Sequence, residues 1–408
     1  MKALVANFSL GREVWDRFKA KMFGNGGGPH ALSLELAEVP EPSIIGSQWV
    51  KIRTVMSGIS GMDESLFVHQ DISPFASFLS FPYIPGHENL GLVTEAGRDV
   101  QGIEEGERVV VDPVLSCRPR GVTPLCPSCV RGDPSTCRNF DKGVLSPGIL
   151  IGACRDTGGG WSDSFIAHRS QVRVLPQNME SDHAILIPEF TRAVRAVLQH
   201  PPAPTDSVIV VGARPLGCLT AIALRLLGHG GKVLMVAEHP LGPELDGKFG
   251  DSQVTLSLGV DLAYEEVAQF VKGAIRYPEV GRITVEGGAD IVYETTGTGE
   301  NIEHALRFTG EGKKLVLMDM NQPSGFDFTP LWFKGVKIFG TLFSGRDSYK
   351  QGVLETFDIA LGLASTEGVF FNELVTHKFR LEEYRSAFET LKNRFANNAL
   401  KVIFQHVV

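Results

Sequence analysis

Residues 207–217 read Ser-Val-Ile-Val-Val-Gly-Ala-Arg-Pro-Leu-Gly, and this stretch decides the fold. The unbroken apolar run before the first glycine predicts a buried strand, and apolar residues at helical spacing over 216–227 predict a helix directly after it. Gly212 and Gly217 have the spacing of the first and last glycines of a G-x-G-x-x-G phosphate-binding turn. Arg214 stands where the middle glycine is expected, so its side chain either points away from a bound phosphate or grips it.

Each part of such a turn has a physical task. The first glycine makes a tight bend, and the last one lets the helix approach the strand closely. The N–H groups that open the helix, next to Pro215 and Leu216, then face the pyrophosphate of a dinucleotide.

Glu238 follows the next predicted strand, at 232–237, and lies 21 residues after Gly217. An acidic residue at this point binds the adenosine ribose hydroxyls and repels a 2′-phosphate, so it favours NAD over NADP. The neighbouring His239 weakens this preference. A doubly wound domain that binds no dinucleotide is the alternative interpretation.

The rest of the chain has three textures. Residues 190–340 alternate strands and helices, which predicts a parallel sheet covered on both faces; further strands are expected at 289–293, 314–318 and 336–339. Residues 1–175 predict a β-rich lobe with a short amphipathic helix at 12–23; its strands are expected at 49–54, 91–95, 108–111 and 171–175. The last stretch predicts helices at 349–363 and 381–395 and a strand at 399–404.

Composition excludes several other classes of protein. The 408 residues include 39 Lys and Arg against 47 Asp and Glu, a net charge of −8, whereas nucleic acid or an anionic membrane requires a clustered basic surface. No apolar run reaches the roughly 20 residues that span a bilayer, and the first residues turn polar too early for a signal peptide. We therefore expect a cytoplasmic protein that binds neither nucleic acid nor membrane.

Cysteine placement gives a second strong signal. Four of the six cysteines fall within 21 residues: Cys117, Cys126, Cys129 and Cys137. In a chain without an export signal, clustered cysteines indicate metal ligands before disulfides. The other two, Cys154 and Cys218, are interpreted as structural.

Four further motifs point to a family. They are Gly-Ile-Ser-Gly-Met-Asp at 58–63, Pro-Gly-His-Glu at 85–88, Glu-Thr-Thr-Gly at 294–297 and Leu-Lys-Val-Ile-Phe at 400–404. Together with the cysteine cluster and the glycine turn, they make the chain resemble the zinc-type medium-chain dehydrogenase/reductases, in the branch of the glucose, sorbitol and threonine dehydrogenases. The resemblance covers nearly the whole chain.

The resemblance implies an α/β architecture. A GroES-like, β-rich catalytic domain is expected at 1–188, a doubly wound Rossmann domain at 189–342, and a C-terminal return to the catalytic domain at 343–408. The implied activity is NAD(P)-dependent transfer of a hydride between nicotinamide and an alcohol or carbonyl substrate, in a homodimer or homotetramer.

In the family, four cysteines spaced Cys-x2-Cys-x2-Cys-x7-Cys hold a structural zinc. Here the last two spacings match, but the first loop, from Cys117 to Cys126, is six residues longer. Thiolates suit Zn²⁺, and a closed four-thiolate site has a structural rather than a catalytic role. Four cysteines without metal are the alternative.

The catalytic zinc site is where the chain departs from the family. Relatives hold this metal with a Cys, the His of the Gly-His-Glu motif and a later Cys, Asp or Glu, and the corresponding positions here are Ser60, His87 and, by a looser match, Glu189. A serine hydroxyl lacks the charge and softness of a thiolate. His87, Glu88 and Glu189 are nevertheless legitimate zinc ligands, so both a retained and a lost zinc stay open.

Without the metal, another group must stabilise the developing alkoxide. His87 as a cation and Ser60 as a hydrogen-bond donor are the candidates, with Glu88 beside them. Met62 and Ser65 occupy the positions of the family's proton relay, and Asp63 is interpreted as scaffold. Three interpretations follow: a metal-free oxidoreductase, a zinc-dependent polyol or alcohol dehydrogenase, and a non-catalytic nucleotide-binding relative.

The resemblance assigns further contacts. Thr296 and Gly297 lie where a Rossmann strand ends at the cofactor, and Lys401 aligns with a basic residue that contacts cofactor phosphate. A stretch that borders the substrate cleft in relatives carries an aromatic residue at every third position, Phe75, Phe78 and Phe81. This spacing suggests an apolar or aromatic substrate, with ordinary core packing as the alternative.

Overall fold

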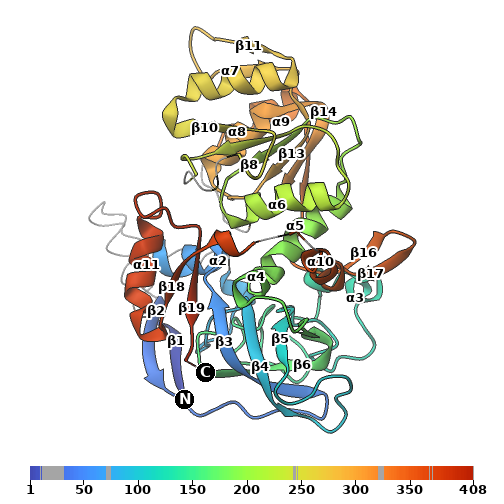
Figure 1. Cartoon of the computed structure of the whole chain (residues 1–408), viewed down its shortest axis with the longest axis vertical. Helices are drawn as coiled ribbons and strands as arrows, with labels where there is room; N and C mark the ends of the chain where they lie inside the picture. The colour runs from blue at the N-terminus through green and yellow to red at the C-terminus, as the bar shows by residue number, and fades with distance from the viewer. Residues whose placement is uncertain are drawn as a thin grey trace. The chain divides into compact units, whose positions relative to one another are not determined.

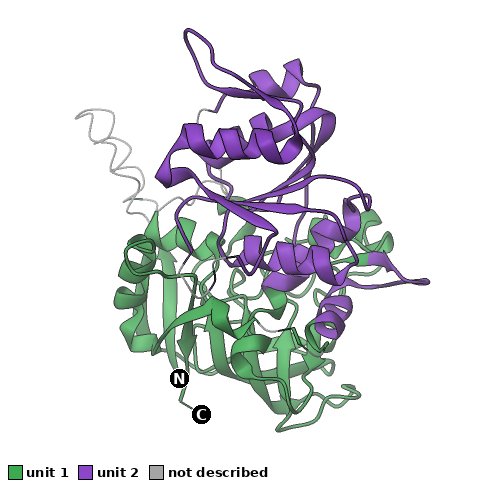
Figure 2. Cartoon of the chain, turned by 45° about the horizontal axis from the view of Figure 1, so that its top comes forward, with its two compact units in different colours: residues 1–188, 344–346, 364–408 green, residues 189–343, 347–363 purple. Residues whose placement is uncertain are grey.

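The chain forms two compact units in a computed structural model, and Figure 2 colours them separately. Unit 1 comprises residues 1–188, 344–346 and 364–408, and unit 2 comprises residues 189–343 and 347–363. The structure describes residues 1–9, 11, 32–69, 75–241, 245, 247–319, 326–366, 368–369 and 371–407. The predicted helix at 12–23 lies outside the described residues.

Unit 2 is built on a parallel sheet of six strands in the order β10-β9-β8-β13-β14-β15. The strands are β8 (Val208–Val211), β9 (Val233–Ala237), β10 (Ser252–Thr255), β13 (Ala289–Glu294), β14 (Thr309–Leu317) and β15 (Lys337–Gly340). Every residue of β8 and β9 is buried, as expected for strands covered on both faces. The five strands predicted from apolar runs in this region correspond to β8, β9, β13, β14 and β15.

Helices cover both faces of this sheet. Figure 1 shows α7 (Val260–Val271) and α8 (Gly299–Phe308) on one face and α6 (Pro215–Leu226) on the other. The apolar sides of α7 and α8 join the sheet in one buried cluster that includes Ile209, Val236 and Val292. Further elements of unit 2 are α5 (Ile187–Gln199), α9 (Thr329–Phe333) and a hairpin of β11 (Ala274–Arg276) and β12 (Thr284–Glu286).

The strand order identifies the doubly wound Rossmann arrangement. It runs outward in opposite directions from β8 and β13, so the order reverses between these two strands. In such sheets, ligands bind beyond the carboxyl ends of the strands at this reversal point. The 212–217 turn follows β8 and the Glu-Thr-Thr-Gly motif ends β13, so both lie at the expected binding edge.

Unit 1 is β-rich. Its main sheet has the order β18-β19-β3-β4-β5-β7, with β6 also paired to β3, and the pair β1-β2 stands apart. These strands are β1 (Lys2–Phe8), β2 (Leu32–Glu38), β3 (Trp49–Gly58), β4 (Asn89–Ala96), β5 (Arg108–Val111), β6 (Ser164–His168), β7 (Val172–Val174), β18 (Val375–Phe379) and β19 (Lys401–Gln405). Its helices are α2 (Gly61–Asp63), α3 (Pro127–Val130), α4 (Ser181–Ala184) and α11 (Tyr384–Lys392). The four predicted N-terminal strands match β3, β4, β5 and β7.

The C-terminal part of the chain differs from its prediction in one place. The helix expected at 349–363 is wrong over its first half, because a hairpin of β16 (Arg346–Tyr349) and β17 (Gly352–Glu355) precedes α10 (Thr356–Ala364). Lys350 at the bend has a φ of 51°, a conformation that a right-handed helix does not admit. Residues 347–363 also belong to unit 2 rather than to the predicted C-terminal segment.

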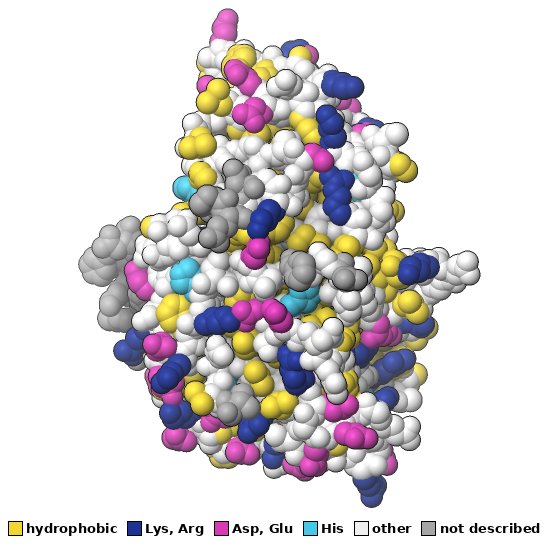
Figure 3. All heavy atoms as spheres, viewed as in Figure 1, with side chains coloured by type: hydrophobic (Ala, Val, Ile, Leu, Met, Phe, Trp, Pro, Cys, Tyr) yellow, Lys and Arg dark blue, Asp and Glu magenta, His cyan; other side chains and the backbone are white. Residues whose placement is uncertain are grey.

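The end of the chain completes the unit 1 site described below. β19 runs antiparallel to β3, with Ile403 opposite Gly58, and the Ile59 N–H donates to the Val402 carbonyl oxygen. This pairing carries Lys401 to the region of the Gly-His-Glu motif. Among the described helices, none is long and apolar enough to cross a membrane. On the face shown in Figure 3, basic and acidic side chains are interspersed.

Candidate active site

The two glycines of the turn in unit 2 are required by close contacts. Gly212 has a φ of +101°, and a Cβ there would overlap the Thr296 methyl group and lie 2.6 Å from Thr295 Oγ1. A Cβ at Gly217 would overlap the Gly212 carbonyl oxygen. The predicted tasks of these glycines, a tight bend and a close helix approach, therefore correspond to the geometry of the turn.

Arg214 occupies the middle glycine position in an ordinary extended conformation, with φ −78° and ψ 172°. Its guanidinium reaches Glu238 at the end of β9, where Nε donates to Oε2 at 3.2 Å and a terminal N–H donates to Oε1 at 3.1 Å. The residue is the N-cap of α6, and Pro215 and Leu216, both buried, open that helix. The sequence leaves two orientations open for the Arg214 side chain. In the structure, this side chain points toward Glu238.

A second carboxylate organises the loop after β13. Glu294 is fully buried and accepts hydrogen bonds from the Thr296 N–H at 2.8 Å, the Thr296 hydroxyl at 2.6 Å and the Gly297 N–H at 3.0 Å. Asn301 joins this network to Glu238, because its Nδ2 donates both to Thr296 Oγ1 and to Glu238 Oε1. Burial raises the pKa of Glu294 to about 7, while its Thr296 and Gly297 donors act to lower it.

In unit 1, two predicted site residues, Ser60 and His87, meet around Asp63. The Ser60 hydroxyl donates to Asp63 Oδ2 at 2.7 Å, the Ser60 N–H donates to the same oxygen at 3.0 Å, and His87 Nδ1 lies 3.9 Å from it. Gly86, with a φ of +96°, sets the position of His87, and its carbonyl oxygen accepts from Gly160 N–H and Asn89 Nδ2. Burial raises the pKa of Asp63, and the His87 ring and the Ser60 donors oppose that shift.

Glu88 has a buried cation as its partner. Lys401 Nζ lies 2.5 Å from Glu88 Oε2, and both side chains are less than one-twentieth exposed. A Cβ at Gly58 would overlap Glu88 Oε2 and lie 3.0 Å from Lys401 Cε, so the glycine of the first motif leaves room for this ion pair. The sequence did not predict this partner for Lys401, and its expected contact with cofactor phosphate stays a prediction.

The donor set of unit 1 does not fit a family-type catalytic zinc. The position of the thiolate holds the Ser60 hydroxyl, which is committed to Asp63, and Glu88 is committed to Lys401. Capturing Glu88 as a ligand would leave a buried lysine without its counter-charge, which is costly. Glu189 lies in the first turn of α5, in unit 2, and its inclusion in a zinc site stays a prediction.

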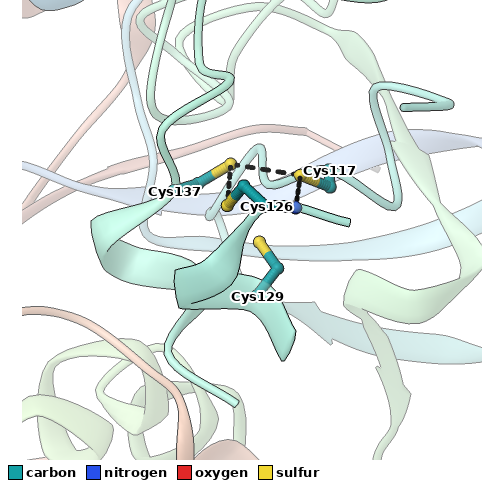
Figure 4. Close-up of side chains that lie close together, drawn as sticks. All are labelled: Cys117, Cys126, Cys129 and Cys137. Carbon is teal, nitrogen blue, oxygen red and sulfur yellow. Dashed lines mark hydrogen bonds between the residues drawn. The ribbon is translucent and has the colours of Figure 1, made fainter. Parts of the chain in front are cut away.

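The four clustered cysteines, in contrast, form a metal-binding arrangement (Figure 4). Their sulfur atoms all lie within 4.8 Å of one another, with 3.6 Å between Cys117 and Cys137 and 3.9 Å between Cys126 and Cys137. Four sulfurs at 2.3 Å from a tetrahedral zinc would be about 3.8 Å apart. A hydrogen bond from Cys129 lowers the pKa of Cys137 to about 5, and N–H groups of Arg138 and Asn139 donate to the sulfurs. These residues fit a structural zinc, which would fix the lobe and supply no reaction chemistry.

Arg120 fills the enlarged first loop of this lobe. It is fully buried, and its guanidinium donates to five carbonyl oxygens, those of Leu115, Lys142, Leu145, Ser146 and Gly148. Arg120 therefore ties the enlarged loop to residues 115 and 142–148, and the four sulfurs still converge.

The remaining predicted residues pack in ordinary ways. Phe75 is buried, Phe78 contacts Phe140 with ring centroids 5.4 Å apart, and Phe81 contacts Phe8 and Tyr83. Of the three, only Phe75 is buried, and Phe78 is 36% exposed, so both core packing and the aromatic substrate stay hypotheses. Cys154 and Cys218 are buried and donate to carbonyl oxygens, and burial raises the pKa of both thiols.

Known proteins share this architecture. A family described as "Alcohol dehydrogenase GroES-like domain" matches residues 46–177. D-arabinitol dehydrogenase 1 of Uromyces fabae is 24% identical over 90% of this chain and 92% of its own length, and sorbitol dehydrogenase of Bacillus subtilis is 23% identical over 91% and 93%. The crystal structure of galactitol-1-phosphate dehydrogenase from Escherichia coli superposes over the full length of both chains, with a TM-score of 0.69 and 20% identity, and so shares the fold.

Residues 46–177 therefore form an alcohol dehydrogenase GroES-like domain, and about nine-tenths of the chain is similar to polyol dehydrogenases, in line with the predicted resemblance to the zinc-type medium-chain dehydrogenase/reductases. The chain has a GroES-like unit and a Rossmann unit, and it is an NAD(P)-dependent oxidoreductase. Both the fold and this class agree with the prediction from the sequence resemblance.

Several contributors to the site were not predicted. Glu294 belongs to the Glu-Thr-Thr-Gly motif, but the sequence analysis gives this residue no role. An acidic residue at the end of a buried strand is nevertheless a signal, because its carboxylate needs nearby hydrogen-bond donors. The roles of Asn301 and Arg120 have no signal in the neighbouring sequence. Asn301 contacts Glu238, which lies 63 residues away, and the carbonyl partners of Arg120 lie 5 to 28 residues away.

The first prediction concerns the cysteine lobe. Replacing Cys129 with Ser removes one thiolate, so we expect zinc affinity to fall by about 100-fold or more and the lobe to lose protection in hydrogen exchange. Zinc content and exchange of residues 117–146 measure this effect. Cys218→Ala, which removes a buried thiol from unit 2, serves as the control and should keep the zinc. Equal zinc content in the two variants would contradict the assignment.

The second prediction concerns Glu294. Its folded pKa of about 7 lies above the ordinary value of 4.5, so the folded state binds more protons between these values. Its contribution to stability is fully present below pH 4.5 and is lost as the pH rises through 7, a change on the order of 3 kcal/mol. Urea unfolding of unit 2 between pH 5 and 7 should lose this dependence in Glu294→Gln and keep it in the exposed control Glu286→Gln. An unchanged slope in Glu294→Gln would refute the argument.

Proposed function

We propose that this protein is an NAD(P)-dependent oxidoreductase that moves a hydride between nicotinamide and an alcohol or carbonyl carbon, without the catalytic zinc of the dehydrogenases that it resembles. The observation that carries the first part is the turn at Gly212 and Gly217, placed at the reversal point of a Rossmann sheet. The observation that carries the second is the commitment of Ser60 to Asp63 and of Glu88 to Lys401.

The nicotinamide ring, when bound, accepts or supplies the hydride. The chain's own residues perform the remaining tasks. N–H groups at the start of α6 bind the pyrophosphate with the favourable end of the helix dipole, and the loop around Thr296 and Gly297, held by Glu294, borders the cofactor.

Proton transfer is assigned to His87. In alcohol oxidation the hydride leaves from carbon, and the hydroxyl proton passes to the imidazole; in carbonyl reduction the protonated ring returns it to the oxygen. Asp63 Oδ2 lies 3.9 Å from Nδ1, on the side of the ring that does not meet the substrate in this assignment, and so provides a carboxylate near the imidazole. Ser60, held against the same carboxylate, supports Asp63.

The substrate is proposed to be a small alcohol or carbonyl compound, with an apolar one as the specific hypothesis. The cytoplasm is the proposed compartment, because four thiol ligands need reducing conditions until the metal binds. A homodimer or homotetramer is also proposed. β15 is the last strand in the order of the described sheet, and Trp332 and Phe333, just before it, are 71% and 73% exposed, an arrangement that favours pairing with a second copy.

The proposal is tested by titrating the purified protein with NADH and NAD⁺, by measuring its zinc content, and by assaying a panel of aliphatic and aromatic alcohols and carbonyls. We expect saturable binding, about one zinc per chain, and turnover that survives chelation of exchangeable metal. About two zinc ions per chain would instead restore the zinc-dependent alternative with His87, Glu88 and Glu189. Coenzyme binding without any turnover would indicate the non-catalytic relative.

A variant separates the proton-transfer role from a structural one. His87→Gln should lower kcat by about 100-fold or more, leave the affinity for NADH unchanged, and remove the corresponding limb of the pH profile of kcat. His377→Gln, which changes a partly buried histidine of β18 in the same unit, is the control and should keep full activity. A parallel loss of NADH binding in His87→Gln would show that the residue is structural.

A further inference from the structure

The coenzyme side of unit 2 contains an ion pair that the family pattern does not predict. Arg214, in the place of the middle glycine, makes a two-point contact with Glu238, the acidic residue at the end of β9. The two side chains are 21% and 17% exposed, so they are partly desolvated and still accessible to a ligand. The two charge-assisted hydrogen bonds fix the positions of both side chains, so a substitution of either residue changes what a ligand bound beside them contacts.

The backbone at Arg214 carries no strain. Its φ of −78° and ψ of 172° are allowed for every residue, and Pro215 after it begins α6 with a suitable φ. The arginine caps the helix without any side-chain hydrogen bond to it. Since neither conformation nor capping requires an arginine here, the contact with Glu238 is the feature that its side chain adds.

The hydrogen bonds leave Glu238 with little capacity for a ribose. A carboxylate offers about four acceptor positions. Arg214 takes two of them, and Asn301 Nδ2 takes a third on Oε1 at 3.1 Å. The two hydroxyls of the NAD ribose would therefore have to displace one of these donors to obtain their usual pair of hydrogen bonds.

The charges point in the same direction. An acidic residue at this position normally rejects NADP because it repels the 2′-phosphate. Here the positive charge of Arg214 neutralises Glu238 at hydrogen-bond distance, and a guanidinium is the preferred protein partner of a phosphate. The same side chain thus weakens the attraction for NAD and removes the repulsion of NADP.

We propose that Arg214 is a coenzyme-specificity residue, which opens this site to the 2′-phosphorylated coenzyme, so that the protein takes NADP as well as NAD. This inference rests on the proposed function, since it presumes that a nicotinamide dinucleotide binds at the 212–217 turn. Glu238 alone predicts a preference for NAD over NADP. With Arg214 beside it, we instead expect the protein to bind both coenzymes.

The test compares dissociation constants of NADH and NADPH for the full-length protein by calorimetry. In the wild type we expect the two values to lie within about tenfold of each other. Arg214→Gly restores the family's glycine, and it should raise the NADPH-to-NADH ratio of dissociation constants by about tenfold or more, through tighter NADH and weaker NADPH binding. Glu238→Gln should shift the ratio in the opposite direction.

Two further variants keep the test decisive. Arg276→Ala removes an exposed arginine that pairs with Glu286 in the same unit, and it should leave the ratio unchanged. Arg214→Lys keeps the charge but not the planar two-point contact, so it should lie between the wild type and Arg214→Gly, and it serves if the glycine variant does not fold. An unchanged ratio in the Arg214 variants, with NADH still bound, would overturn this inference alone. Absence of saturable binding of both coenzymes to the wild type would overturn the proposed function as well.

Discussion

The approach of two backbone segments at Gly212 and Gly217 is the constraint on which unit 2 depends. The start of α6 touches the end of β8 so closely that a single methyl group on Gly217 would overlap a carbonyl oxygen. Only this contact aims the first N–H groups of the helix beyond the carboxyl edge of the sheet. The loop after β13 closes on the same turn, because the Thr295 hydroxyl donates to the Val211 carbonyl oxygen.

The same physical rule explains the side chains around both parts of the candidate site. A carboxylate removed from water needs donors or a counter-charge. Glu294 obtains N–H and O–H donors from its own loop, Glu238 obtains a guanidinium, and Glu88 obtains a lysine from the last strand of the chain. The site is therefore built from acids whose partners are supplied within one unit, and each partner limits what that acid can bind next.

Much of this architecture is predictable, for reasons that are local. The buried parallel strands are recognisable as unbroken apolar runs. Two of the three cysteine spacings match the family pattern, and the four sulfurs converge although the first loop is six residues longer. Partner choice is different. Lys401 and Glu88 lie far apart in the sequence, so their contact has no local signal. The Arg214 side chain points toward Glu238, and this contact depends on where β9 ends. The helix expected at 349–363 failed because helical periodicity does not register a turn at Lys350.

The hydroxyl at position 60 and the pairing of Glu88 with Lys401 have the same effect on the unit 1 cluster, because each reduces the negative charge available to a dication. A divalent zinc in the family's site is balanced by anionic ligands, so removing the metal alone would leave uncompensated negative charge in a buried place. In this chain the serine removes one charge, Lys401 balances another, and Asp63 is left with the Ser60 donors and the nearby His87 ring. Each carboxylate of the cluster thus has a nearby donor or cation. A dication entering it would have to compete with Lys401 for Glu88 and with the Ser60 hydroxyl for Asp63.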